Sequence, residues 1–206
     1  MNTLFTGCEH DNHFNIIKYC NRPFKNTVEM TKRLVFEHNQ RVKEHDTVYH
    51  LGDTAFYGNS KNGNGKKIDP IVYIDKLNGN HIFIEGNHDR SGRNKVKTKN
   101  EQIILNQRGV RIQLLHDPLY ARIDYDLIIH SHVHNLWKVK ELFYCGEIRL
   151  MINVGVDVWK FKPVTLDEIL SIYHRWKKER SKIKRWEKPQ ILTDLNKGTL
   201  SEEKHQ

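Results

Sequence analysis

Residues 81–89 read HIFIEGNHD, an apolar strand-like run that ends at once in Gly-Asn-His-Asp. Isoleucine and phenylalanine favour a strand, and glycine is a common breaker where a strand gives way to a loop. Asn87, His88 and Asp89 are therefore expected at a strand end. A single histidine there is usually structural, so the meaning of this group depends on how the other strands end.

The same arrangement recurs along the chain. Polar groups that can bind metals follow four more predicted strands: Cys8 and His10 after TLFT, Asp53 after VYHLG, His116 after IQLL, and His132 with His134 after LIIHS. Strands of one sheet end on a common edge, so these groups are expected to converge. A bridging carboxylate with imidazole and amide neighbours suits two divalent cations.

The order of predicted elements indicates the fold class. A helix is expected over residues 26–44, where Asn26 and Glu29 have capping-box spacing and one face carries Val28, Leu34, Val35 and Val42. Hairpins are expected over residues 102–117 and 138–155. Strands, helices and hairpins in mixed order predict a layered α+β domain with mixed sheets, not a doubly wound parallel one.

Composition narrows the function class. The chain has 206 residues and a net charge of +9, which favours an anionic partner such as a phosphorylated small molecule or nucleic acid. Three cysteines without CxxC spacing argue against a disulfide framework. The chain has no apolar run of membrane-spanning length and no secretory leader, so we expect a soluble cytoplasmic protein with no membrane partner.

The ordered motifs carry a resemblance. CEH (8–10), GD (52–53), GNHD (86–89), His116 and HSHVH (130–134) resemble the DxH, GD, GNHD, His and GHxH pattern of the calcineurin-like metallophosphoesterases. The stretches NIIKYCNRPF (15–24), DTVYHLGD (46–53) and INVGVDVWKFKPVTLDEI (152–169) are similar to a group of small bacterial and phage phosphoesterases. The resemblance covers residues 1–172.

The resemblance implies a four-layer αββα sandwich of two mixed sheets flanked by helices. It implies a dimetal phosphoester hydrolase in which a metal-bridging hydroxide attacks phosphorus, with two ions drawn from Mn, Fe, Zn or Ni. Matched position by position, the resemblance implies that the first metal is held by Cys8, His10, Asp53 and His134. It implies that the second metal is held by Asp53, Asn87, His116 and His132. His88 takes the position of the general acid or phosphate-binding histidine, and Asp89 would orient it.

Cys8 departs from the family pattern, because it stands where the family has aspartate. A rival register, Asp11-x-His13, keeps a carboxylate but breaks the alignment with the following NII, so we favour Cys8. As a thiolate ligand, Cys8 would favour zinc or iron. Alternatively Cys8 is a small buried residue beside a three-ligand metal, or the activity is lost. Ser131 replaces a family glycine, a milder departure.

Basic and histidine side chains near the motifs are candidates for contacts with an anionic substrate. Arg90 and His13 are candidate substrate-binding residues. Further cations stand in the two loops that follow Asp53 and Asp89: Lys61, Lys66, Lys67, Arg93 and Lys95. The charge favours a phosphodiesterase acting on nucleotide or nucleic-acid-like substrates. The alternatives are a phosphomonoesterase and a non-catalytic metal-binding scaffold.

The C-terminal part divides into two expected segments. After a domain over residues 1–172, we expect a basic helix over 173–188 and a polar tail over 189–206. Residues 174–188 hold eight basic and two acidic side chains. The favoured interpretation is an amphipathic helix whose aromatic stripe packs on the domain, and the alternative is a nucleic-acid-binding helix.

Overall fold

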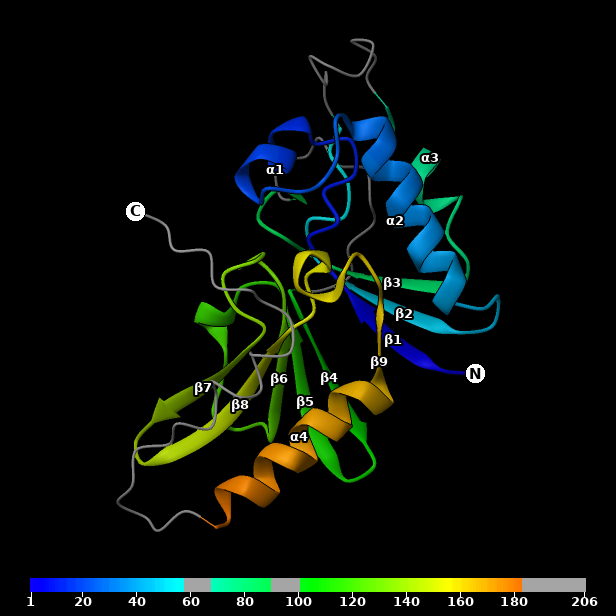
Figure 1. The fold of residues 1–206 in the computed structure, drawn as a ribbon. Coiled ribbons are helices and arrows are strands. Elements are labelled where there is room, and N and C mark those ends of the chain that lie inside the picture. The colour runs from blue at the N-terminus through cyan, green and yellow to red at the C-terminus, as the bar shows by residue number, and fades with distance from the viewer. Residues whose placement is uncertain (58–67, 90–100, 183–206) are drawn as a thin grey trace.

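The first of two β-sheets contains the N-terminal strands of the chain (Figure 1). The computed structural model describes residues 1–57, 68–89 and 101–182. The strands of this sheet are β1 (Thr3–Thr6), β2 (Thr47–Leu51), β3 (Asn80–Ile84) and β9 (Val164–Thr165), in the order β3-β2-β1-β9. β1, β2 and β3 are parallel, and β9 is antiparallel to β1.

The second sheet is built largely from the two predicted hairpins. Its strands are β4 (Gln102–Gln107), β5 (Val110–Leu115), β6 (Leu127–His130), β7 (Val139–Tyr144) and β8 (Glu147–Asn153), in the order β4-β5-β6-β8-β7. β5, β6 and β8 run parallel, while β4 and β7 are the antiparallel edge strands. The prediction of an α+β fold with two mixed sheets is confirmed.

The main hydrophobic core lies between the sheets. Each sheet contributes fully buried side chains to it: Phe5, Leu51 and Ile84 from the first, and Ile112, Leu114, Leu127, Ile129, Leu150 and Ile152 from the second. Burying so much apolar surface fixes the two sheets against each other. The loops at one end of this sandwich are therefore held at a defined separation.

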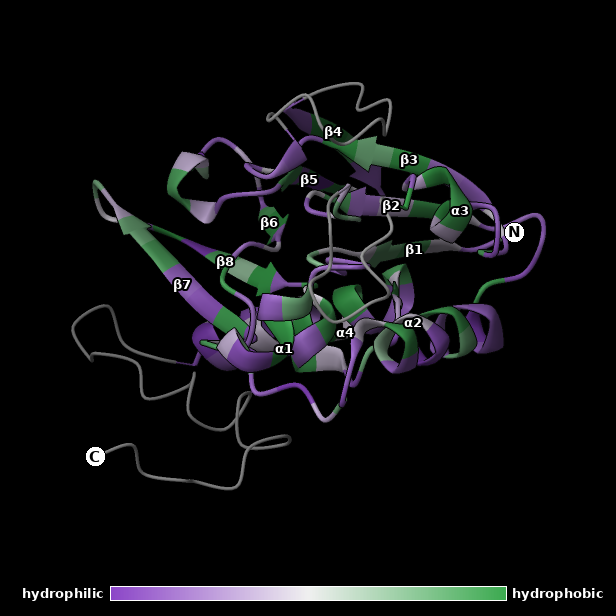
Figure 2. Ribbon diagram, turned by 90° about the horizontal axis from the view of Figure 1, so that it is seen from above, coloured by the Kyte–Doolittle hydropathy of each residue, from purple (hydrophilic) through white to green (hydrophobic). Residues whose placement is uncertain are grey.

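Three helices, α1 (Phe14–Tyr19), α2 (Thr27–Arg41) and α3 (Ile71–Ile74), pack together beside the first sheet. At the start of α2, Asn26 Oδ1 accepts a hydrogen bond of 2.9 Å from the backbone N–H of Glu29, as predicted. Of the four side chains predicted to share one face, Leu34 and Val42 are buried and Val35 is partly buried. Val28 is 54% exposed, so its place on that face is wrong: it lies on another side of the helix from the buried Met30 and Leu34. Figure 2 shows α2 alternating between hydrophobic and hydrophilic segments.

Helix α4 (Leu166–Arg180) continues directly from β9, so the expected boundary between residues 172 and 173 falls inside it. Tyr173 and Trp176 are buried in the main core, and Trp176 Nε1 donates a hydrogen bond of 2.7 Å to Glu141 of β7. The aromatic face of α4 therefore packs on the domain. The remainder of the expected basic helix, 183–188, and the tail 189–206 lie outside the described residues. No helix in the described parts of the chain is long and apolar enough to cross a membrane.

Candidate metal centre

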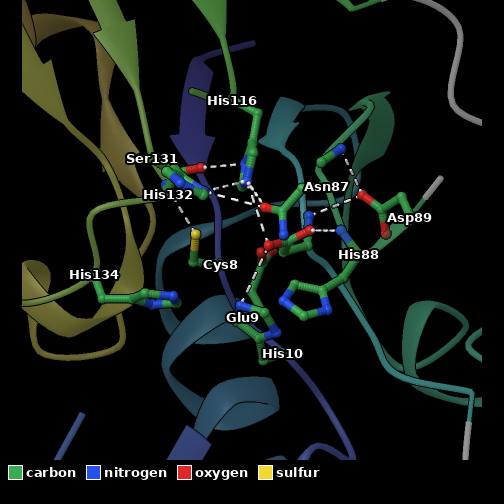
Figure 3. A network of polar contacts seen from close by, with 12 residues as sticks. Cys8, Glu9, His10, Asn87, His88, Asp89, His116, Ser131, His132 and His134 are labelled. Atoms are coloured by element: carbon green, nitrogen blue, oxygen red, sulfur yellow. Dashed lines mark hydrogen bonds and ion pairs between the residues drawn. The ribbon is translucent and has the colours of Figure 1, made fainter. Parts of the chain in front are cut away.

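Five parallel strands deliver the motif residues to one place (Figure 3). β1, β2 and β3 end at one edge of the first sheet, and β5 and β6 end at the facing edge of the second. The structure thereby brings together all the residues assigned as ligands: Cys8, His10, Asp53, Asn87, His116, His132 and His134. The expected convergence of strand ends is what the fold produces.

Asn87, His116 and His132 form one group of facing ligand atoms. His116 Nε2 lies 2.9 Å from Asn87 Oδ1, and His132 Nδ1 lies 3.1 Å from that oxygen and 3.0 Å from His116 Nε2. His116 Nδ1 lies 2.8 Å from the Leu51 carbonyl oxygen, which can only accept, so Nδ1 carries the proton. Burial acts to lower the pKa of His116, but the hydrogen bond and charge of Asp53 outweigh it and raise the pKa. A divalent cation would take the place of the proton on His116 Nε2 and face the Asn87 oxygen as well.

The Asp53 carboxylate lies between this group and the next. Its Oδ2 is 3.3 Å from His116 Nε2 and 3.5 Å from His10 Nε2, and its Oδ1 accepts a hydrogen bond of 2.9 Å from the backbone N–H of His88. Burial acts to raise the pKa of Asp53, but the hydrogen bond and charge of His116 outweigh it and hold the pKa well below its usual range. Asp53 is therefore ionised where a bridging ligand would stand.

Cys8, His10 and His134 form the second group. One ligand atom from each lies within 4.8 Å of the others, and Cys8 is also within that distance of Asp53 and His116. His10 Nε2 is buried and has no hydrogen-bond partner in the described part of the chain. Burial, opposed by the charge of Asp53, holds the pKa of His10 well below its usual value, so the ring is neutral, the form that binds metals.

The structure separates the two candidate registers of the first loop. Cys8 Sγ accepts a hydrogen bond of 3.0 Å from the backbone N–H of His132, next to the ligand atoms. The Asp11 carboxylate instead accepts a hydrogen bond from the Thr31 hydroxyl of α2. Among the described residues, Asp11 belongs to none of the clusters that can hold a metal. The geometry therefore favours Cys8 over Asp11 as the residue of the first strand end that faces the centre.

These residues fit two divalent cations. Among the described residues the buried His10 Nε2 has no hydrogen-bond partner, and a metal ion would supply one. Asn87 Oδ1 lies 2.9 Å from His116 Nε2, and a cation would bind both atoms once the ring is neutral. The donor set of imidazoles, carboxylate, amide oxygen and one sulfur suits borderline transition ions. Burial, followed by the charge of Asp53, raises the pKa of the Cys8 thiol well above its usual value, so a bound cation is what would make it a thiolate.

His88, His13 and Asp89 surround this centre. The His88 side chain is exposed, with its ring centroid 5.3 Å from that of His10. The His13 ring lies 5.9 Å from that of His88, and burial, followed by the charge of His88, lowers the pKa of His13 to about 4. Asp89 Oδ2 accepts hydrogen bonds of 2.8 Å from the backbone N–H groups of Asp53 and Gly86. Asp89 thus joins the GD loop to the GNHD loop. The sequence predicted only that Asp89 orients His88, not this structural role.

A cavity of about 430 Å³ opens beside Asn87 and His116. Tyr120, Gln102 and Arg122 line its other side. This volume is in the range of small-molecule sites. The predicted substrate residue Arg90 lies outside the described residues, as do the five loop cations Lys61, Lys66, Lys67, Arg93 and Lys95.

The ligand loops share an unusual backbone conformation. A left-handed φ between 47° and 64° occurs at five of the residues that face the centre: Cys8, His10, Asp53, His132 and His134. Such conformations cost free energy in residues other than glycine and persist where the surrounding structure enforces them. They turn successive side chains of a tight loop toward one point, which an extended strand cannot do.

Ser131 has a role that the sequence did not reveal. Its hydroxyl lies 3.0 Å from His116 Nδ1 and also donates to the Leu51 carbonyl oxygen. A Cβ on Gly7 would lie 2.8 Å from Ser131 Cβ, closer than real contacts allow. The serine that replaces the family glycine is therefore accommodated by a glycine across the sheet interface, and it helps hold the His116 ring.

Gly7→Ala is expected to destabilise the protein by ~1–3 kcal/mol, because the added methyl group overpacks against Ser131. Urea unfolding in the presence of chelator measures this change. The double variant Gly7→Ala with Ser131→Gly should recover most of the loss, because it removes the atoms that clash. Equal losses in the single and double variants would contradict the steric explanation.

A buried network behind the first loop was also missed. Glu9, between two ligand residues, places Oε1 2.5 Å from His50 Nδ1, and His50 Nε2 lies 3.0 Å from His81 Nδ1. Burial raises the pKa of Glu9 to about 8 and lowers the pKa of His50 to about 3. Through this network the Glu9 side chain, turned away from the candidate ligands, anchors the first loop to β2 and β3.

Comparisons with known proteins agree with this architecture. The chain is 38% identical over 174 residues to the uncharacterized protein MJ1445 of Methanocaldococcus jannaschii, which covers 84% of this chain and 91% of the relative. At this identity and coverage the two chains are members of one family.

Among solved structures, the protein of unknown function AQ665 from Aquifex aeolicus has a TM-score of 0.62 and 24% identity, covering 83% of this chain and 98% of that one, which shows a shared fold. Yfce, a phosphoesterase from E. coli, is similar with a TM-score of 0.44 and 17% identity over 74% of this chain and 78% of that one. No family model matches the chain.

Proposed function

We propose that this chain, which belongs to the calcineurin-like metallophosphoesterase superfamily, is a dimetal-dependent hydrolase of phosphoesters. The observation that supports this most is the Asp53 carboxylate, ionised and placed between two groups of ligand atoms, one of which contains His10 Nε2, buried and without a hydrogen-bond partner among the described residues. One carboxylate shared by two such groups is the arrangement that holds two metals close together. A site that only binds metals would not require the exposed His88 beside the two metal positions.

Each group of residues has a chemical role in this proposal. Two bound divalent ions would lower the pKa of a water molecule and offset the charge that develops on the phosphate. Cys8, His10 and His134 would hold one ion, and Asn87, His116 and His132 the other, with Asp53 shared. His88, exposed at the mouth, would donate a proton to the departing oxygen.

The substrate we propose is a phosphodiester of a nucleotide type. The net charge of +9 favours an anionic substrate, and the cavity beside Asn87 and His116 offers Tyr120 to its organic part. Aromatic side chains stack on bases without needing a particular sequence. A diester presents one negative charge to the two metals, leaving the second ester group for the cavity.

Purified protein loaded with Mn²⁺ or Zn²⁺ is expected to cleave bis(p-nitrophenyl) phosphate faster than p-nitrophenyl phosphate. The measurement is kcat/KM for both esters at the same metal concentration, with Asp53→Asn as the blank for contaminating phosphatases. If the monoester is clearly the better substrate, the diester preference fails and the protein is a phosphomonoesterase. If neither ester is cleaved above the blank, the proposed catalysis fails.

For an ester whose leaving group is an alcohol, His88→Ala is expected to lower kcat by about 10²–10⁴-fold, because the variant lacks the proton donor for the leaving oxygen. Metal content by mass spectrometry should stay unchanged, since the side chain belongs to neither ligand group. His45→Ala, an exposed histidine in the turn before β2, is the matched control and should leave kcat unchanged. A fall in kcat that disappears with p-nitrophenol leaving groups, which need no proton, would support the assigned role. Loss of bound metal in His88→Ala would contradict it.

A further inference from the structure

Two sequence stretches that contain no assigned ligand meet behind the metal centre. Arg22 follows α1 in the stretch NRPF, and Asp157 lies in the short 3-10 helix Val156–Trp159 that follows β8. Arg22 Nε donates to Asp157 Oδ1 over 2.7 Å, and Arg22 Nη2 donates to Oδ2 over 3.0 Å. This is a two-point pairing of a guanidinium with a carboxylate, the strongest geometry for such a pair.

The remaining donors of Arg22 hold the first ligand loop. Nη1 donates to the Glu9 carbonyl oxygen and Nη2 to the Cys8 carbonyl oxygen, each over 2.8 Å. Cys8 has a left-handed φ of 51°, which is costly for a residue with a side chain. Hydrogen bonds from a buried guanidinium to both carbonyls compensate for that cost and fix the direction of the loop.

Asp157 holds the other side of the same ligand group. Its Oδ2 lies 3.3 Å from His134 Nδ1. A carboxylate at this nitrogen keeps the proton on Nδ1 and leaves Nε2 as the metal-binding atom. The side chains of Arg22 and Asp157 are only 1% and 3% exposed, so the pair works in a medium of low polarity. Removing one partner of such a pair leaves an uncompensated buried charge.

We propose that Arg22 and Asp157 are positioning residues for the first metal position, holding Cys8 from one side and His134 from the other. This inference rests on the proposed function, because it concerns one of the two proposed metals, but it does not depend on hydrolysis. Through the pair, residues 8 and 134, which are distant in sequence, share one buried charged support.

The same residues offer a competing arrangement. Cys20, His134 and Asp157 also place ligand atoms within 4.8 Å of one another, as a cation site would. Both Asp157 oxygens, however, already accept hydrogen bonds from the Arg22 guanidinium. A cation there would have to displace or face that positive charge, so Asp157 supports a ligand and is not itself one.

The test measures metal binding without substrate. Wild-type protein, purified without chelator, is titrated with Co²⁺ while absorbance and bound metal are recorded. Asp157→Asn should lower affinity at one position about 10–100-fold and leave the other within about twofold. The absorption band that a thiolate gives with Co²⁺ should weaken in parallel, because Cys8 and His134 belong to the affected position.

Two further variants keep the test decisive. Arg22→Lys keeps the charge but loses the hydrogen bonds to the Cys8 and Glu9 carbonyls, so it should lower metal affinity at the same position. It replaces Asp157→Asn in the test if circular dichroism shows that Asp157→Asn does not fold. Arg41→Lys is the matched control: Arg41 pairs with Glu168 over 2.8 Å, and neither residue contacts the centre. It should leave both affinities unchanged.

The outcomes separate this inference from the proposed function. Unchanged binding at both positions in folded Asp157→Asn or Arg22→Lys overturns the inference, whether or not the wild-type protein hydrolyses esters. Two bound ions in the wild type with selective loss in the variants, but no hydrolysis of any ester, supports the inference and removes the proposed function. Fewer than two ions in the wild type overturns both.

Discussion

Asp53→Asn should abolish hydrolysis, with kcat/KM falling by at least about 10²–10³-fold, and should leave the fold intact. In the variant, an amide N–H₂ can replace Oδ2 and donate toward His10 Nε2 and His116 Nε2, the atoms that Asp53 now faces at 3.5 Å and 3.3 Å. The variant amide would occupy the space between the two ligand groups with its own donors. Metal affinity is therefore expected to fall at both positions together, unlike the selective loss expected for Asp157→Asn.

Two measurements check this result. Metal content per chain by mass spectrometry should fall from two toward none, and the free energy of unfolding in chelator should stay within about 1 kcal/mol of the wild type. Asp75→Asn, at the exposed C-terminal end of α3, is the matched control and should behave as wild type in both. Retention of two metals with full activity would remove Asp53 from the proposed mechanism.

The strand ends explain why the convergence of the candidate ligands could be predicted from sequence. Period and composition identify strands such as IFI before Gly86 and LII before His130, and parallel strands must end at a common edge. Once β1, β2 and β3 are parallel, Asp53 and Asn87 are neighbours whatever the details of the loops. Local pattern and sheet geometry together therefore determine which residues can meet.

The supports of these ligands could not be found in the same way. Arg22 and Asp157 are 135 residues apart, and no local period marks an arginine that will be buried in a two-point pairing. Glu9 looks like a surface residue in sequence, yet it is buried against His50 of the neighbouring strand. These contacts depend on how the loops pack against the sheets, which is decided by tertiary structure.

The left-handed residues show a second limit of the sequence. Glycine marks such conformations, and Gly52 does so at the GD turn with a φ of 84°. Cys8, His10 and His134 adopt them without that marker, because neighbouring hydrogen bonds hold them there. The sequence therefore predicted which loops meet at the candidate centre but not how each loop turns its side chains inward.

As a ligand, Cys8 would decide which metals the proposed centre prefers. The sulfur lies among the ligand atoms, grouped within 4.8 Å with those of Asp53 and His116 and likewise with those of His10 and His134. A thiolate is softer than a carboxylate and prefers zinc, iron or cobalt to manganese or magnesium. If Cys8 is a ligand, the two metal positions should differ in metal preference, and the first position should be the more selective for soft metals.

Cys8→Asp is expected to reverse this preference, lowering the affinity of the first position for Zn²⁺ relative to Mn²⁺ by at least about tenfold. The measurement is competitive binding of Zn²⁺ and Mn²⁺, read in both proteins as bound metal by mass spectrometry. Separately, the absorption band between thiolate and Co²⁺ should be present in the wild type and absent in the variant. Cys8→Ala should bind one ion tightly in place of two, since it offers no ligand atom at that point.

Cys145→Ala supplies the matched control, because Cys145 is exposed at the turn between β7 and β8 and should leave the Co²⁺ band unchanged. Two tightly bound ions in Cys8→Ala, with the wild-type preference for Zn²⁺ over Mn²⁺, would make the cysteine a bystander. The first metal would then rest on His10, Asp53 and His134 alone, and Asp11 could replace Cys8 only if its bond to Thr31 were broken. If Cys8→Ala instead loses both the thiolate–Co²⁺ band and one bound ion, the Cys8 sulfur is a metal ligand, because removing a side chain that does not bind metal would cause neither loss.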